Sequence, residues 1–158
     1  MGLSFWILGL VVGLFAAVLF VGAPYLPTLR SQAETAFDLL GLEEGQTLLE
    51  LGCGDGKVLV LAAQQGYKAV GIELNPILFV VSWLRTFRYR ENVRVVWGDF
   101  WRVPWPEADG VFVFLLDPFM PKLDGRMQTY KRPLASVAFK VPGKMPARQK
   151  NGVFLYKY

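Results

Sequence analysis

The sequence predicts an α/β fold with a doubly wound, mostly parallel sheet, preceded by one transmembrane helix. Beyond residue 40, short apolar runs alternate with stretches of helical periodicity, which is typical of a parallel sheet with helices on both faces. A glycine-rich turn joins the first of these runs to the helix after it, as in many folds of this class. Residues 3–23 carry no charged side chain. We therefore expect an anchor over residues 1–24 and one domain over residues 25–158.

Residues 3–23 have the length of a membrane-spanning helix. Such a helix is about 31 Å long at about 1.5 Å per residue, which matches a hydrocarbon core of about 30 Å. The alternative, a cleaved signal peptide, needs a positively charged start that residues 1–6 lack, and cleavage after Ala23 would leave Pro24 at the new terminus. An uncleaved anchor is the better interpretation.

Three small residues follow one another at helical spacing in this segment, at Gly9, Gly13 and Ala17. Such a stripe lets two membrane helices pack closely, so a homodimer is one interpretation. Small residues are also common in membrane helices that do not pair, and this simpler interpretation is favoured.

The elements of the domain follow in a regular order. The first helix is expected over residues 28–40, with Thr28 as N-cap and Gly41 as its stop. The predicted strands are 47–51, 68–73, 93–97, 110–116, 134–141 and 152–158, and the predicted helices between them are 57–65, 76–90 and 123–130. Two prolines and a glycine make residues 142–151 too irregular for a crossover helix. The last strand is therefore expected to return antiparallel to the one before it, as a hairpin.

The helix over residues 76–90 is apolar on nearly every side. Burial against the sheet is the expected reason. The alternative is partial insertion into a bilayer surface, with Arg85 and Arg88 at the lipid headgroups.

Composition excludes several kinds of site. The chain has no histidine and one cysteine, which rules out an internal disulfide, Cys/His zinc sites, Ser-His-Asp triads and Cys-His dyads, and no metal site is expected. The formal net charge of +4 fits either a solvated basic face or contact with anionic headgroups. Nucleic acid is not an expected partner, because it is hard for a domain tethered at a bilayer to reach.

The turn after the first strand carries glycines at alternate positions, Gly52, Gly54 and Gly56. A dinucleotide site needs the spacing G-x-G-x-x-G and a pyrophosphate at the helix N-terminus, where Asp55 would repel it. A cationic ligand would instead be attracted by Asp55. The sulfonium and amino group of S-adenosylmethionine are positive, so Glu50 and Asp55 favour this cofactor.

Acidic residues also end the next two strands. Glu73 follows Gly52 by about twenty residues, at the position where a carboxylate accepts from ribose hydroxyls. Asp99 follows the third strand and can accept from an adenine amino group, with the Phe100 ring beside it for stacking. Acids at three strand ends, taken in order, indicate one site rather than three unrelated loop residues.

The set formed by Glu50, the glycine turn, Glu73 and Asp99 resembles the Rossmann-type S-adenosylmethionine-dependent methyltransferases. Four stretches are similar to the small membrane-anchored protein-lysine methyltransferases, which include the mitochondrial enzymes that modify the adenine nucleotide translocase and the ATP synthase c-subunit, and prokaryotic relatives. These stretches are YLPT before the first helix, LGCGDGKVLVLAA, GYKAVGIELNP and GDFWRV. The resemblance spans roughly residues 25–140.

The resemblance implies roles for single residues. The turn residues Gly52, Gly54, Asp55 and Gly56 would line the methionine portion of the cofactor. Glu73 would hold the ribose and Asp99 the adenine. Tyr25 and Thr28 precede the motif in the family too, and would face the methionine end.

The acceptor site is expected after the fourth strand. Asp117, Pro118 and Phe119 lie where amino-group methyltransferases place a polar residue, a proline and an aromatic ring. Asp117 is expected to orient the acceptor amine, and Phe119 and Trp101 to offer it cation–π faces. The alternative is a solvated acid beside aromatic side chains of the core. Eukaryotic relatives carry a non-acidic stretch here, so the resemblance does not fix the acceptor.

The predicted function is that of a membrane-anchored S-adenosylmethionine-dependent methyltransferase acting on a protein lysine at the membrane. One alternative keeps the cofactor but methylates a lipid, a quinone or another small membrane molecule. Another is a non-catalytic membrane scaffold with a degenerate methyltransferase fold. The domain is expected on the cytoplasmic side of a single-pass anchor, consistent with Arg30 close after it.

Overall fold

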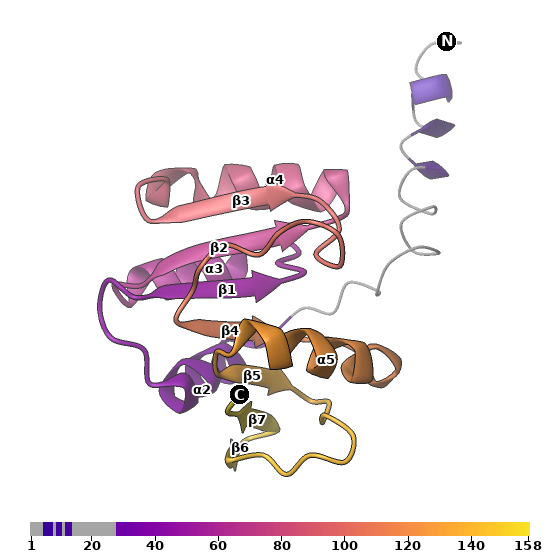
Figure 1. The fold of residues 1–158 in the computed structure, drawn as a ribbon. Helices are drawn as coiled ribbons and strands as arrows, with labels where there is room; N and C mark the ends of the chain where they lie inside the picture. The colour runs from indigo at the N-terminus through magenta and orange to yellow at the C-terminus, as the bar shows by residue number, and fades with distance from the viewer. Residues whose placement is uncertain (1–4, 8, 11, 14–27) are drawn as a thin grey trace.

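The fold is described from a computed structural model, which covers residues 5–7, 9–10, 12–13 and 28–158 (Figure 1). In chain order the elements are α2 (Arg30–Leu40), β1 (Thr47–Leu51), α3 (Lys57–Gln64), β2 (Lys68–Glu73), α4 (Pro76–Thr86), the 3₁₀ helix η1 (Phe87–Tyr89), β3 (Val93–Trp97), β4 (Gly110–Val113), the 3₁₀ helix η2 (Asp117–Phe119), α5 (Met120–Tyr130), β5 (Leu134–Val137), β6 (Arg148–Lys150) and β7 (Val153–Tyr156).

The strands form one seven-stranded sheet in the order β3-β2-β1-β4-β5-β7-β6. Strands β1 to β5 pair in parallel, and β7 pairs antiparallel with both β5 and β6. This confirms the predicted mostly parallel α/β sheet and the antiparallel return of the last strand. Strand β6 was not expected, because its residues Arg148, Gln149 and Lys150 are all exposed and show no apolar alternation.

Helices cover both faces of the sheet. Figure 1 shows α3 and α4 behind the sheet and α5 in front of it. The side chains of β1 alternate accordingly: Leu48 packs in the core under α2 and α3, whereas Leu49 and Leu51 pack in the core under α5. A parallel sheet needs this cover on both sides, since its strands are apolar on both.

The first described helix begins later than expected. Helix α2 starts at Arg30 with Leu29 as its N-cap residue, so the prediction that Thr28 is the N-cap is wrong. The Gln32 side chain accepts a hydrogen bond from the Leu29 N–H at 3.2 Å and thereby takes over part of the capping. Thr28 is left free to contribute to the site described below.

The predicted strands over residues 110–116, 134–141 and 152–158 are shorter in the structure. β5 ends at Val137 because Ala138 has a φ of 65°, which breaks the extended chain. The helix predicted from residue 123 begins at Met120, directly after η2. The stretch around Asp117 is therefore a helical turn at the end of the chain segment that leaves β4.

Helix α4 is only partly buried against the sheet, which corrects the expectation from its apolar sequence. Only Ser82 and Thr86 of its 11 residues are fully buried, while Trp83 and Leu84 are 49% and 61% exposed. The reason is its position, because β3 is the edge strand and the described part of the chain places no further strand beyond it for α4 to cover. The two small buried side chains mark the narrow stripe by which α4 contacts the rest of the domain.

The predicted anchor lies mostly outside the residues that the structure describes, as does Ala17 of the small-residue stripe. Within the described part of the chain, we find no helix whose length and apolar character would suffice to cross a bilayer. The anchor over residues 1–24, the domain boundary at residue 25 and a homodimer through Gly9, Gly13 and Ala17 stay predictions.

Candidate active site

The candidate site lies at the C-terminal end of β1, where the strand order reverses between β1 and β4. The turn that follows β1 holds its three glycines at φ of 77°, 53° and 78° for Gly52, Gly54 and Gly56. Other residues adopt this region only with strain. At Gly56 a Cβ atom would also lie 3.1 Å from the Ser82 Cα on α4. Backbone conformation and close packing thus both require glycine here.

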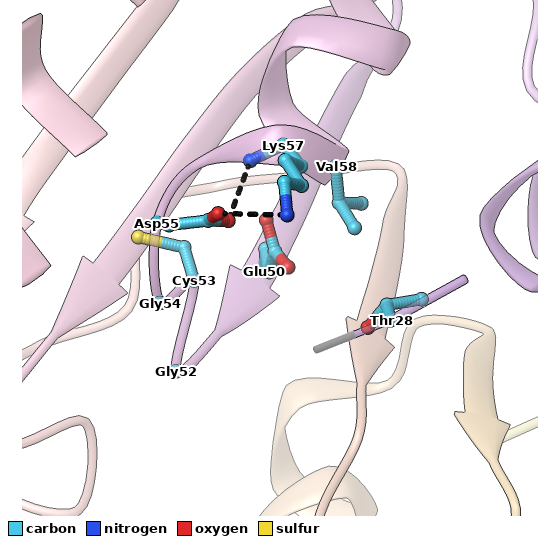
Figure 2. A pocket seen from close by; sticks show the side chains of 8 residues that line it. All are labelled: Thr28, Glu50, Gly52, Cys53, Gly54, Asp55, Lys57 and Val58. Carbon is cyan, nitrogen blue, oxygen red and sulfur yellow. Dashed lines mark hydrogen bonds and ion pairs between the residues drawn. The ribbon is translucent and has the colours of Figure 1, made fainter. Parts of the chain in front are cut away.

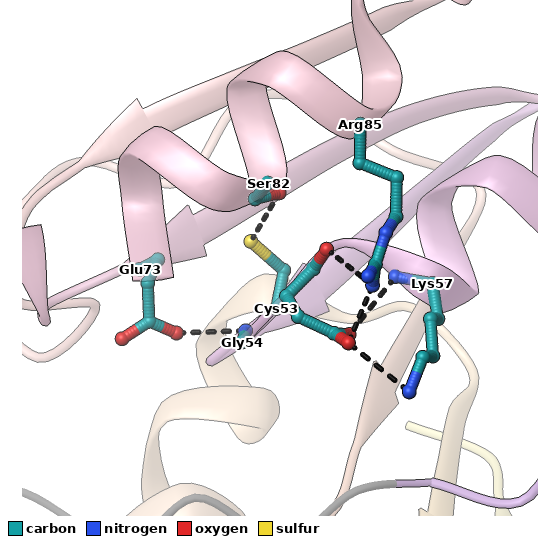
Figure 3. A network of polar contacts seen from close by, with 7 residues as sticks. Cys53, Gly54, Lys57, Glu73, Ser82 and Arg85 are labelled. Carbon is teal, nitrogen blue, oxygen red and sulfur yellow. Dashed lines mark hydrogen bonds and ion pairs between the residues drawn. The ribbon is translucent and has the colours of Figure 1, made fainter. Parts of the chain in front are cut away.

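Hydrogen bonds fasten the turn to the end of β2. The Gly52 and Cys53 N–H groups both donate to the Ile72 carbonyl oxygen, at 2.9 and 3.1 Å. The Gly54 N–H donates to Glu73 Oε2 at 2.8 Å (Figure 3). The turn is therefore built by two neighbouring strands rather than by its own sequence alone.

Glu73 is held as a fixed acceptor. It is 7% exposed, and its second oxygen, Oε1, accepts from the Asn75 N–H at 2.8 Å. Burial raises the pKa of this carboxyl, and the backbone hydrogen bonds from Asn75, Gly54 and Leu74 counteract part of that rise. Each carboxylate oxygen can accept more than one hydrogen bond, so both retain capacity for a ligand hydroxyl.

Glu50 carries an unpaired buried oxygen. It lies near the end of β1 at 4% exposure, and its Oε2 has no hydrogen-bond partner among the residues that the structure describes. Burial raises the pKa of the Glu50 carboxyl well above its ordinary value, and the negative charges of Glu73 and Asp55 add to the shift. Buried polar atoms are nearly always satisfied, so this oxygen marks a place for a donor that the described chain does not supply.

Glu50 also lines a small hollow beside the turn (Figure 2). The lining residues are Thr28, Glu50, Gly52, Cys53, Gly54, Asp55, Lys57 and Val58. A ligand with a positive amino group fits this lining, because the group would pair with the buried carboxylate that lacks a partner. Thr28 is part of this lining, and its expected place at the methionine end of the cofactor stays a prediction.

Asp55 already has two cationic partners. Its carboxylate lies 3.2 Å from the Lys57 ammonium (Figure 2) and also pairs with Arg85, and its carbonyl oxygen accepts from Arg85 Nη1 at 2.9 Å. Burial opposes ionisation here, but these partners lower the pKa of the Asp55 carboxyl below its ordinary value. Asp55 therefore holds the turn on α4. Sequence reasoning missed Arg85 and Lys57 as members of the site.

Asp99 and Phe100 follow the strand next to Glu73. Trp97 is the β3 partner of Glu73 in the sheet register, so Asp99 lies two residues beyond it. Asp99 Oδ1 accepts from the Trp101 N–H at 2.9 Å, and its other oxygen lies 3.4 Å from Arg102 Nε. The Phe100 ring lies 3.9 Å from where a Cβ on Gly52 would stand. The structure thus brings Phe100 to the turn, while Asp99 and Glu73 lie outside the lining of the hollow.

The three residues predicted for the acceptor side are spread over two segments. Asp117 is exposed in η2, at the end of the segment leaving β4. Phe119 and Trp101 are half-buried and pack against the same core. The Trp101 ring already carries a cation, because the Lys122 ammonium of α5 lies 4.4 Å from its centroid. The Trp101 ring face can therefore hold an amine, and in this structure the Lys122 ammonium occupies it.

Arg126 is a further member of the site, and no sequence pattern predicted it. From α5, its guanidinium donates to the Phe100 carbonyl oxygen at 2.6 Å and to the Val103 carbonyl oxygen at 2.8 Å. It also stacks over the Trp105 ring at 4.2 Å. These contacts tie the segment after β3 to α5 and so set where Asp99 and Phe100 lie.

The sheet order and the glycine turn, with acids after β2 and β3, are the architecture of class I S-adenosylmethionine-dependent methyltransferases. The structure superposes on an RNA methyltransferase from Salinibacter ruber, solved with S-adenosyl-L-homocysteine, with a TM-score of 0.75. The two share 25% sequence identity over 84% of this chain and 92% of that one. The cofactor of this class is S-adenosylmethionine, which becomes S-adenosyl-L-homocysteine when it gives up its methyl group.

The chain belongs to the family of the ANTKMT methyltransferase domain, whose sequence model matches residues 50–148. It is 32% identical over 116 residues to the ATP synthase c-subunit lysine N-methyltransferase of Xenopus laevis, covering 72% of this chain and 51% of that protein. A protein-lysine N-methyltransferase of Saccharolobus islandicus is 28% identical over 131 residues, covering 78% and 81%. The chain spans about half the length of the vertebrate relatives it matches. The resemblance predicted from the sequence is confirmed.

Proposed function

We propose that this protein is an S-adenosylmethionine-dependent methyltransferase that methylates a lysine side chain of another protein. The single observation that carries the cofactor site is the buried Glu50 oxygen without a partner in the described chain, at the edge of a glycine turn that Glu73 holds in place. The acceptor class is supported by the lysine methyltransferases of Xenopus laevis and Saccharolobus islandicus, to which the chain is similar.

The cofactor would bind across the ends of three strands. Its methionine end fits the hollow at the turn, with its ammonium on Glu50 and with Gly52, Gly54 and Gly56 giving close access to the backbone. Its ribose hydroxyls would donate to the carboxylate of Glu73. Its adenine would lie at Asp99 and the Phe100 ring. When bound, the cofactor supplies an electrophilic methyl group.

The chain's own residues would position the acceptor. Asp117 is exposed at the same edge of the sheet and is suited to orient an amine. Phe119 follows it in η2, and the acceptor would take the place of Lys122 on the Trp101 ring. A lysine amine can lose its proton to solvent before it attacks, so no strong base is required. The protein's contribution is then the alignment of two bound groups and the exclusion of water.

The membrane location is part of the proposal. We assign residues 1–24 to a single transmembrane anchor and residues 25–158 to the methyltransferase domain, on the cytoplasmic side where the cofactor is made. The support is the uncharged run of residues 3–23, long enough to cross a bilayer. An anchored domain would meet lysines near the boundary of the bilayer.

A second candidate function is methylation of RNA. The specific observation that favours it is the superposition on the Salinibacter ruber RNA methyltransferase over 92% of that chain. Probable ribosomal RNA small subunit methyltransferases of two Methanosarcina species are also 32% identical to parts of this chain. The net charge of +4 is compatible with such a substrate.

One assay separates these functions. The full chain is added to membranes from cells that lack its gene, together with S-adenosylmethionine that carries a labelled methyl group. The label is then measured in protein bands, in RNA and in the organic phase. Label in a protein band that yields methyllysine supports the proposal. Label in RNA or in extracted lipid and quinone instead overturns the acceptor assignment. No calorimetric binding of S-adenosylmethionine would indicate a scaffold. The Glu73→Ala variant, which should not bind the cofactor, is the control from which no transfer of label is expected.

A further inference from the structure

Helix α4 and its neighbourhood carry an exposed apolar surface, which we call the α4 face. Its members are Val80 (48% exposed), Trp83 (49%), Leu84 (61%), Phe87 (48%) and Trp97 (62%). The first four follow the spacing of one helix side, at i, i+3, i+4 and i+7. Single exposed apolar residues are ordinary on a protein surface, but four on one side of a helix, with a second tryptophan on the neighbouring strand, mark a surface that contacts something.

The aromatic side chains of the α4 face are fixed in place. The Trp83 and Phe87 rings meet edge to face at 5.7 Å between centroids. The Trp97 ring lies 6.4 Å from Phe79, and its Nε1–H donates to the Leu74 carbonyl oxygen at 3.1 Å. With its one polar group satisfied by the protein, Trp97 turns a largely apolar surface outward. The face is therefore preformed.

Positive charge borders the α4 face. Three arginines, Arg85, Arg88 and Arg90, lie in and directly after α4, and one acid, Glu91, follows them. Arg90 lies over the Phe87 ring at 5.0 Å, so cation and apolar side chains share one surface. Tryptophan, aliphatic side chains and arginine are the combination that settles at the boundary between lipid tails and anionic headgroups.

The proposed anchor brings a bilayer within reach of this surface. If the membrane helix ends at residue 24, residues 24–27 connect it to Thr28, and a fully extended chain of that length spans at most about 14 Å. Thr28 lines the hollow at the C-terminal edge of the sheet, and α4 begins at that same edge, after β2. The domain would thus lie close to the membrane. Helix α4 runs from this edge back to the opposite one, where β3 begins, so its exposed side can lie along the bilayer.

We propose that the α4 face is a second membrane contact, resting on the lipid surface with its apolar side chains among the acyl-chain boundary and its arginines at anionic headgroups. The inference rests on the proposed function in one respect, which is the membrane anchor that keeps the domain close to the bilayer. It goes further by fixing the orientation of the domain. Because Arg85 of α4 also holds Asp55 of the turn, the docked helix would hold the cofactor site at a set height above the bilayer.

The test uses the full chain in nanodiscs of phosphatidylcholine with about one quarter phosphatidylglycerol. An environment-sensitive fluorophore is attached to Leu84→Cys, and in a matched variant to Gln149→Cys, on β6 at the opposite edge of the sheet. Native Cys53 is 5% exposed, and the unsubstituted chain reports any labelling of it. Quenching by lipids brominated along the acyl chain reports contact with the bilayer.

The proposal expects a blue shift and bromolipid quenching at position 84, and neither at position 149. A smaller shift in pure phosphatidylcholine is expected from the arginines, and an equal shift there removes their assigned role. A label at position 84 that behaves like the one at position 149 overturns the proposal. A blue shift without quenching, or one lost on dilution of the protein, shows a protein partner or second copy and also overturns it.

Failure of the tether is detected separately. Extraction of the chain by alkaline carbonate would contradict the anchor, whatever the label at position 84 shows. If the anchor fails but the label is still quenched, the α4 face stands as a membrane contact by itself. Methyl transfer to protein, RNA or lipid is measured in the earlier assay and is independent of both results.

Discussion

The Gly54 amide donates a 2.8 Å hydrogen bond to Glu73 Oε2, which joins the glycine turn of β1 to the end of β2. The other oxygen of Glu73 accepts from the Asn75 amide, and the Asn75 side chain in turn caps α4 by accepting from the Ile77 N–H. One buried carboxylate thus sets the turn, the start of α4 and the proposed ribose contact. Glu73 therefore has both a structural role and a proposed ligand-binding role.

Replacement of Glu73 separates these roles. Glu73→Ala should abolish cofactor binding and also destabilise the domain, because two buried N–H groups lose their acceptor at about 1–3 kcal/mol each. Glu73→Gln keeps one acceptor oxygen and should lose less stability, while it weakens the ribose contact. Isothermal titration with S-adenosylmethionine and urea unfolding measure the two effects. Unchanged affinity in either variant would show that the ribose assignment is wrong.

Glu50 should link folding to pH. Its pKa is raised above the ordinary value of 4.5, so between that value and the raised pKa the folded state binds a proton that the unfolded state has lost. Stability of the ligand-free protein should then fall as the pH rises through this window, and remain lowered above it. Glu50→Gln should remove this slope and stabilise the ligand-free protein at neutral pH. Thermal unfolding between about pH 4.5 and 8 measures it.

The same carboxylate should make cofactor binding depend on pH. A cationic amino group on Glu50 favours the ionised form, so binding should release a proton wherever free Glu50 is still protonated. Calorimetry in buffers of different ionisation enthalpy counts that proton, and Glu50→Gln should abolish the release and lower the affinity. Identical proton release by the variant would place the cofactor's amino group elsewhere.

Sequence patterns predicted the part of the fold that apolar periodicity and strand order control. They located β1, β2 and β3 and the acids at their ends, because each strand is an apolar run with a polar stop. They missed the edge strand β6 because its residues Arg148, Gln149 and Lys150 are all exposed. The sequence therefore shows no alternation of apolar and polar residues there. Hydrogen bonds between distant segments, such as those of Arg126, leave no local signal at all.

The prediction that α4 is buried against the sheet was only partly right, for a related reason. Apolar residues on every side of a helix normally indicate burial, and periodicity cannot distinguish a core from another apolar surrounding. Only the sheet order shows that α4 borders the edge strand β3, which leaves Trp83 and Leu84 exposed. Asp55 is a second case in which the sequence alone is insufficient. The sequence shows the acid, but it does not show that Arg85 of α4 pairs with it.

Asp117 is expected to act on the acceptor alone. It is exposed in η2 and lies outside the lining of the hollow, so Asp117→Asn should leave the dissociation constant of S-adenosylmethionine unchanged and lower turnover about tenfold or more, the loss expected when a positioning contact of about 1.4 kcal/mol is removed. Asp38→Asn, on the exposed side of α2, is the matched control. Equal turnover of the two variants would remove Asp117 from the acceptor site.

Arg126 should matter to cofactor binding although it lies outside the lining of the hollow. Its two hydrogen bonds to the Phe100 and Val103 carbonyl oxygens need a planar guanidinium, and a lysine cannot make both. Arg126→Lys should let the segment that carries Asp99 shift. The loss of about 1.5 kcal/mol, the value of one hydrogen bond to a charged group, would raise the KM for S-adenosylmethionine about tenfold.

The pattern of this loss distinguishes positioning from a general weakening of the fold. The KM for the cofactor should rise while kcat at saturating cofactor stays close to the unsubstituted value, because Asp117 and the acceptor side are untouched. Arg148→Lys on the exposed edge strand β6 controls for the arginine-to-lysine change itself. A variant that loses stability without a change in the KM for the cofactor would show that Arg126 serves only the packing of α5 against the Trp105 ring.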